Sequence, residues 1–161
     1  MFAGGATFNN MPLHPLLVHF AVVLILLAAC LAILVVVWPA ARRRLGLIVP
    51  LVALVALVLT PITTNAGEAL AATKRRINPA LAQHMELGDQ MIWWIAPLFL
   101  ATAGFWAIHS FRRSDVAGVG VTGRRRGMSM ALAVVTVILA VGNVIWVYRI
   151  GDTGAQSVWL H

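Results

Sequence analysis

The chain has 161 residues, of which 61% are hydrophobic and only 11% are charged, and its formal net charge is +7. Soluble domains are nearer half apolar and a quarter charged, so this composition excludes an ordinary soluble protein and leaves no room for a separate soluble catalytic domain. The basic residues lie in short clusters between apolar runs, as the topology determinants of membrane proteins do. We therefore expect no nucleic-acid partner.

Four continuous apolar stretches predict four transmembrane helices in a single all-α domain. The expected spans cover residues 15–38, 45–70, 80–110 and 128–149. Each is close to the ~20 residues that a helix needs to cross a hydrocarbon core of ~30 Å, and continuous runs exclude the alternating strands of a β-barrel. Pro61 and Pro97 predict kinks or breaks inside the second and third spans, because proline removes a backbone hydrogen bond.

The distribution of basic residues predicts the orientation of these spans. Eight lie in the loops after the first and third spans, and four lie on the opposite side. The positive-inside rule therefore places both termini outside the cytoplasm. The first group comprises Arg42, Arg43, Arg44, Arg112, Arg113, Arg124, Arg125 and Arg126, and the second comprises Lys74, Arg75, Arg76 and Arg149. The Gly- and Arg-rich stretch 112–127 is predicted to be a mobile cytoplasmic loop.

Most of the histidines and acids fall at the outer end of this predicted bundle. Ionisable groups at membrane depth are costly and tend to mark function, although a position in headgroups or water would explain several of them equally well. Glu68 and Asp152 are candidates for carrying protons or tuning local charge. The outer group consists of His14, His19, His84, His161, Glu68, Glu86, Asp89 and Asp152.

His14 and His19 do not form a helical metal pair. Their five-residue spacing puts them about 140° apart around a helix axis, so they cannot share one face. The HExxH and CxxC patterns are also absent, and Cys30 is the single cysteine. A metal held by protein ligands alone therefore has little support in the sequence.

A haem has more support. The third span runs parallel to the first, so His84 enters the bilayer on the same side as His19. Two imidazoles from parallel helices can ligate haem iron from both sides, with His14 as a substitute for either ligand. The alternative is a structural role, in which His19 forms a hydrogen bond with a neighbouring helix.

Further residues at this end suit a porphyrin. Gly88 and Gly142 are small residues that a porphyrin face needs where it meets a helix, although glycines also allow close helix packing. Arg149 and Lys74 are candidates for holding the propionates. Asn143, in the fourth span, is expected to hold helices together.

Several motifs resemble those of the bacterial membrane-protein family known as domain of unknown function 2231. They are LHPLLVHF at residues 13–20, NAGE at 65–68, the segment 84–89, and YRIGDTG at 148–154. The resemblance covers nearly the whole chain, and the preference for arginine over lysine looks like the actinobacterial branch. Many relatives carry proline after the His-Phe pair, where this chain has Ala21.

The resemblance implies a multi-pass protein of the bacterial plasma membrane with four helices and no established activity. Some relatives are joined to Rieske-type or cytochrome modules, and the arrangement is similar to small membrane b-type cytochromes. The positions that match the family's histidine motif are His14, His19 and His84.

These observations predict a haem b electron carrier rather than a stand-alone enzyme, with His19 and His84 as metal ligands. A quinone or a membrane redox complex would be the electron partner, in addition to the lipid bilayer, and a homo-oligomer stays open. The alternative is a cofactor-free structural or assembly subunit of a larger membrane complex. A transporter has less support, because the cytoplasmic halves of the first and fourth spans are almost wholly apolar.

Overall fold

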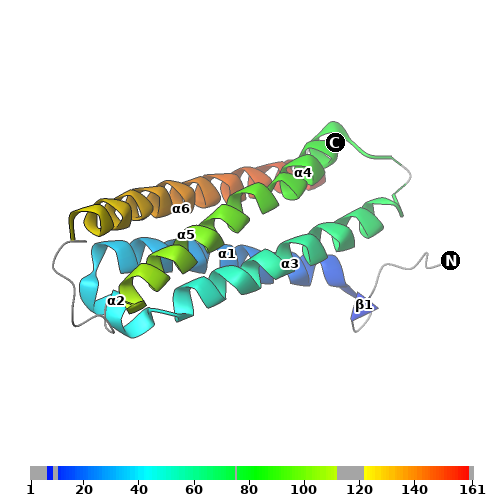
Figure 1. Cartoon of the computed structure of the whole chain (residues 1–161). Helices are drawn as coiled ribbons and strands as arrows, with labels where there is room; N and C mark the ends of the chain where they lie inside the picture. The colour runs from blue at the N-terminus through cyan, green and yellow to red at the C-terminus, as the bar shows by residue number, and fades with distance from the viewer. Residues whose placement is uncertain (1–6, 9–10, 75, 112–121, 160–161) are drawn as a thin grey trace.

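The computed structural model describes residues 7–8, 11–74, 76–111 and 122–159 and is a bundle of long helices (Figure 1). Two two-residue strands, β1 (Thr7–Phe8) and β2 (Met11–Pro12), pair antiparallel before the first helix. The expected all-α membrane fold is confirmed, since four helical segments are long and apolar enough to cross a membrane. The helices are α1 (Leu13–Val37), α2 (Pro39–Leu45), α3 (Ile48–Ala71), α4 (Pro79–Gln90), α5 (Ile92–Phe111) and α6 (Thr122–Trp159).

The four long helices form a ring in which each packs against two neighbours. α1 packs against α3 and α6, and α5 packs against the same two helices, while α4 lies mainly along α6. α1 begins and α6 ends at the same end of the bundle, which we call the terminal end (Figure 1). The opposite end carries α2, the end of α5 and the start of α6, and we call it the arginine end. Which end faces the cytoplasm stays a prediction.

Small side chains fill the inside of the bundle, and large apolar ones cover the outside. Ala29 and Ala32 of α1 and Ala56 of α3 are fully buried in the same core. Small residues let helix backbones approach closely. Close packing is what holds membrane helices together, because lipid tails are as apolar as the protein interior and no hydrophobic effect drives the helices to associate. Phe20 and Val23, by contrast, are more than 60% exposed, with relative exposures of 64% and 62%, as lipid-facing side chains are.

The third span is divided at Met91 rather than at its proline. α3 and α5 run through Pro61 and Pro97 without a break, whereas the Met91 N–H donates to the Gly88 carbonyl in a tighter turn between α4 and α5. The expectation of a break at either proline is therefore wrong, while the expected kinks stay a prediction. Transmembrane helices tolerate proline because nearby groups can satisfy the carbonyl that loses its partner one turn before it.

α4 begins with a cap formed by residues within one turn of its start. Asn78 precedes the helix, and its Oδ1 accepts the Leu81 N–H at 2.7 Å, while Pro79 occupies the first turn, where its missing N–H costs nothing. The Asn78 amide also donates to the Ser157 carbonyl at 3.1 Å. The helix cap therefore joins the start of α4 to the last turns of α6.

α6 is longer at both ends than the predicted fourth span of 128–149. Residues 122–127 are helical, so the expected loop is wrong for that part, while residues 112–121 lie outside the described chain. At the other end the helix continues to Trp159, because α4 packs along its last turns. Hydropathy shows only the apolar centre of a helix and misses polar turns that a neighbouring helix stabilises.

Candidate functional site

His84 is the histidine at the terminal end whose surroundings the structure defines most fully. It lies on α4, is half-buried, and its Nδ1 is 2.9 Å from the Ile150 carbonyl oxygen of α6. A carbonyl only accepts hydrogen bonds, so Nδ1 carries a proton, and in the neutral imidazole Nε2 then keeps its lone pair. Histidines that bind metals commonly use one ring nitrogen in this way, because the bond fixes the tautomer and the ring orientation.

A glycine on α6 makes room for the His84 ring. A Cβ at Gly154 would lie 3.1 Å from both Cε1 and Nδ1 of His84. A larger residue at this position would press on the ring and disturb its bond to Ile150. The Ile150 carbonyl and Gly154 therefore act together, one orienting the ring and the other allowing it to approach α6.

His19 and His84 lie on different helices. His19 is exposed on α1, and His84 lies on α4, where it contacts α6; α1 also packs against α6. The pairing of these two rings as axial ligands stays a prediction. The side chain of His14 and the whole of His161 lie outside the described structure.

The predicted propionate partners lie at the terminal end. Arg149 is exposed on α6, and its Cζ is 4.9 Å from the centroid of the Trp146 ring. Trp146 donates from Nε1 to the Leu87 carbonyl of α4 at 3.1 Å. The guanidinium of Arg149 therefore lies beside a contact between α4 and α6. Lys74 is exposed in the connection after α3. Within the described chain, neither Arg149 nor Lys74 has a carboxylate partner.

The remaining predicted residues are distributed over three helices. Gly88 of α4 faces α3, since a Cβ there would lie 3.8 Å from Thr64 Cγ2. Glu68 is exposed on α3. Asp152 is exposed on α6, where it accepts a hydrogen bond from Gln156 at 3.0 Å. Both carboxylates are therefore at the surface of the bundle, and their role in tuning charge stays a prediction.

Gly142 has a packing role instead of the predicted porphyrin contact. A Cβ there would lie 2.3 Å from Cζ3 of Trp94, so the indole already occupies the space beside this glycine. Asn143, which is fully buried, donates to the Trp94 carbonyl at 3.0 Å and confirms the expected joining of helices. Trp94 and Trp146 pack with their ring centroids 5.3 Å apart.

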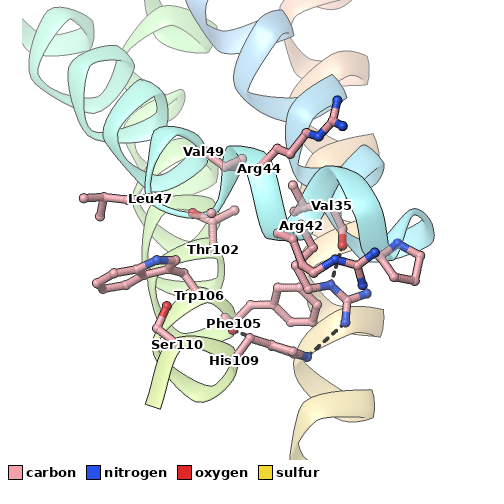
Figure 2. Close-up of a pocket in the computed structure, with 13 residues that line it drawn as sticks. Val35, Arg42, Arg44, Leu47, Val49, Thr102, Phe105, Trp106, His109 and Ser110 are labelled. Atoms are coloured by element: carbon pink, nitrogen blue, oxygen red, sulfur yellow. Dashed lines mark hydrogen bonds between the residues drawn. The ribbon is translucent and has the colours of Figure 1, made fainter. Parts of the chain in front are cut away.

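A second cluster, at the arginine end, was not found by sequence reasoning. Arg42 of α2 donates from Nε to the Val35 carbonyl at 2.8 Å and from a terminal nitrogen to the Val36 carbonyl at 2.7 Å, so it caps the end of α1. Its other terminal nitrogen lies 3.0 Å from Nε2 of His109 (Figure 2). Arginine only donates, so this imidazole nitrogen accepts, and Nδ1 donates to the Phe105 carbonyl at 2.7 Å.

This cluster borders a cavity of about 380 Å³ between α2, the start of α3 and the end of α5. Its lining includes Arg42, Arg43, Arg44, Trp106, His109 and Ser110. The sequence predicted only topology-determining arginines in this region. The one local signal for the extra helix was Pro39, which follows Trp38 and occupies the first turn of α2.

Among the described residues, no group of three or more His, Cys, Asp or Glu side chains is placed to hold a metal ion. A haem needs fewer ligands from the protein, because the porphyrin supplies four ligands to the iron and the protein supplies one or two. His84 fits that requirement, since its ring is half-buried, fixed by Ile150 and accommodated by Gly154. The chemistry of the donor set therefore suits a haem better than a bare metal ion.

The family model described as a predicted membrane protein, domain of unknown function 2231, matches residues 10–161. The chain belongs to this family. Together with the four apolar helices, the match makes this family member a multi-pass membrane protein. It matches none of the curated proteins and none of the solved structures with which it was compared.

Proposed function

We propose that this member of the domain of unknown function 2231 family is a haem b electron-transfer protein of the bacterial plasma membrane, with the haem at the terminal end of the bundle. The observation that carries the proposal is the hydrogen bond from His84 Nδ1 to the Ile150 carbonyl. It leaves Nε2 as the ligand atom of a neutral imidazole, which suits an iron that cycles by one electron.

Other residues at this end complete the proposed site. His19 or His14 of α1 is the proposed second axial ligand. Arg149 and Lys74 would bind the propionates, and the stacking of Arg149 on Trp146 supports this role because it restrains the guanidinium. A bound haem supplies the one-electron chemistry, and a quinone or a membrane redox complex is the proposed partner. Glu68 and Asp152 would tune the charge around the site.

The second candidate function is a cofactor-free structural or assembly subunit. Two glycine contacts favour it, because Gly142 receives Trp94 and Gly154 receives His84 within the bundle itself. Helix packing explains these glycines without a ligand. The exposed position of His19 also fits this alternative.

The absorption spectrum of the detergent-solubilised protein distinguishes the two functions. We expect a Soret band that sharpens and shifts on reduction, either as purified or after addition of haem. His84→Ala should abolish binding, while His109→Gln, which changes the histidine at the arginine end, should retain the spectrum. Imidazole added to His84→Gly should restore part of the band, because the free ligand replaces the missing side chain.

Two results would contradict the proposal. A colourless protein that also fails to bind added haem would favour the structural subunit. A Soret band unchanged in His84→Ala would show that His84 is not a ligand. His19→Ala then identifies the second ligand, since its loss should convert a low-spin spectrum to a high-spin one.

A further inference from the structure

Asn143 of α6 has a buried oxygen whose need for a hydrogen bond the described chain does not meet. The residue is fully buried, and its Nδ2 donates to the Trp94 carbonyl at 3.0 Å and to the Leu139 carbonyl at 2.8 Å. Its Oδ1 accepts from no donor among the described residues. A polar atom without a partner is costly inside a protein, and more so inside a membrane, where bulk water does not reach it. We therefore expect a donor from outside the chain at this oxygen.

The orientation of the Asn143 amide is fixed by the two carbonyls that it faces. A carbonyl oxygen only accepts hydrogen bonds, whereas the amide carries both an acceptor oxygen and a donor nitrogen. Exchanging the two ends of the amide would set Oδ1 against the Trp94 and Leu139 carbonyls, and both contacts would be repulsive. The atom without a partner is therefore the oxygen, and the partner that it requires is a hydrogen-bond donor.

A second acceptor without its usual donor lies beside this contact, on α5. Pro97 is inside α5 and has no N–H, so the carbonyl of Trp93, four residues earlier, lacks the hydrogen bond of a regular helix. The Trp93 carbonyl comes directly before the Trp94 carbonyl to which Asn143 donates, and successive residues of a helix rise by about 1.5 Å along its axis. Two acceptors that need a donor therefore lie at the same level of the contact between α5 and α6.

The surroundings of Asn143 favour a very small molecule. Asn143 and Ala140, which precedes it by one turn on α6, both have a relative exposure of 0%. The Trp94 ring already occupies the space beside Gly142 and packs on Trp146. Water is the smallest molecule with two hydrogen-bond donors, and it commonly bonds to buried groups that the chain leaves unsatisfied. Ordered water is also one of the means by which membrane helices satisfy carbonyls that a proline has freed.

We propose that one water molecule is bound inside the bundle between α5 and α6, donating one hydrogen to Oδ1 of Asn143 and the other to the carbonyl of Trp93. The water joins the two helices beside the direct bond from Asn143 to the Trp94 carbonyl. It therefore holds α5 against α6 at the point where Pro97 interrupts the hydrogen bonds of α5. The site requires no cofactor, so its failure would leave the proposed haem site at His84 unaffected.

Magnetisation transfer between water and the protein, measured by NMR for the full-length protein in detergent, tests this site. Isotopic labelling of asparagine alone limits the side-chain amide signals to the five asparagines of the chain, and the signal that Asn143→Leu removes is that of Asn143. We expect a rotating-frame cross-peak between the Asn143 amide protons and water, opposite in sign to the diagonal. This sign identifies a bound water, because exchange of the amide protons themselves gives the same sign as the diagonal.

Pro97→Ala tests whether the water bridges the two acceptors. Alanine returns an N–H to the Trp93 carbonyl and suits a helix, so the fold should be retained while the cross-peak weakens several-fold or is lost. Pro61→Ala is the matched control, since it makes the same change inside α3 and should leave the cross-peak unchanged. The signals of the other asparagines show whether each variant is folded as the wild-type protein is.

Absence of the cross-peak from the folded wild-type protein would overturn the proposal. A cross-peak as strong in Pro97→Ala as in the wild-type protein would overturn it as well, because the water would then not bridge to Trp93. An equal loss in Pro61→Ala would show that the effect does not depend on that carbonyl and would count against the bridge in the same way. Loss in Pro97→Ala alone is the result that supports the bound water.

Discussion

Replacing Gly142 with alanine tests the packing of α6 against α5 most directly. The added Cβ would lie 2.3 Å from Cζ3 and 2.7 Å from Cε3 of Trp94, whereas carbon atoms in contact are ~3.5–4.0 Å apart. The indole would have to move by more than about 1 Å. Trp146 also packs against the indole, at a centroid distance of 5.3 Å. The strain therefore has no easy release.

The expected cost follows from this overlap. Overpacking a well-packed interior costs about 1–3 kcal/mol. Alanine also gains ~0.8–1.0 kcal/mol over glycine in a helix, which would hide part of the cost. Gly151→Ala is the matched control, because Gly151 lies on the same helix with nothing within 4 Å of its Cβ position. The difference between the two variants isolates the overlap.

Thermal unfolding in one detergent measures that difference. For a chain of this size 1 kcal/mol corresponds to about 2–4 °C, so Gly142→Ala should unfold roughly 2–12 °C below Gly151→Ala. Trp94→Leu in the Gly142→Ala background should recover part of the loss, because it removes the overlapping ring. Equal melting temperatures for the two alanine variants would refute the packing of Trp94 on Gly142.

Two further substitutions test the polar contacts of the helices. Arg42→Ala should cost about 1–3 kcal/mol, measured by thermal unfolding, because it removes the side-chain donor of the Val35 and Val36 carbonyls and the contact with His109. The control is Arg126→Ala, at an exposed arginine of α6, which should change stability by less than ~0.5 kcal/mol. Equal effects of the two substitutions would contradict the capping role. Asn143→Asp should destabilise the bundle far more than Asn143→Leu. The reason is that aspartate replaces the amide donor that faces the Trp94 and Leu139 carbonyls with a buried acceptor. An aspartate variant as stable as the leucine variant would refute this contact.

The local features of this protein could be predicted from its sequence because they depend on neighbouring residues. Each apolar run is long enough to require a membrane, so the four spans follow from length and hydropathy alone. Asn78 and Pro79 likewise begin α4 through a cap that needs only residues within one turn. The membrane class and the approximate position of each membrane-spanning helix were therefore decided before any packing was known.

The contacts between helices were decided only by the tertiary structure. His84 binds the Ile150 carbonyl of α6, Trp94 occupies the space beside Gly142, and Arg42 turns back to cap α1 and contact His109. In a soluble protein an apolar stripe shows which face of a helix is buried. A membrane helix is apolar on nearly every face, so its hydropathy does not predict which face packs against the other helices. Small residues and a few polar atoms fix that rotation, and their partners lie far away in the chain.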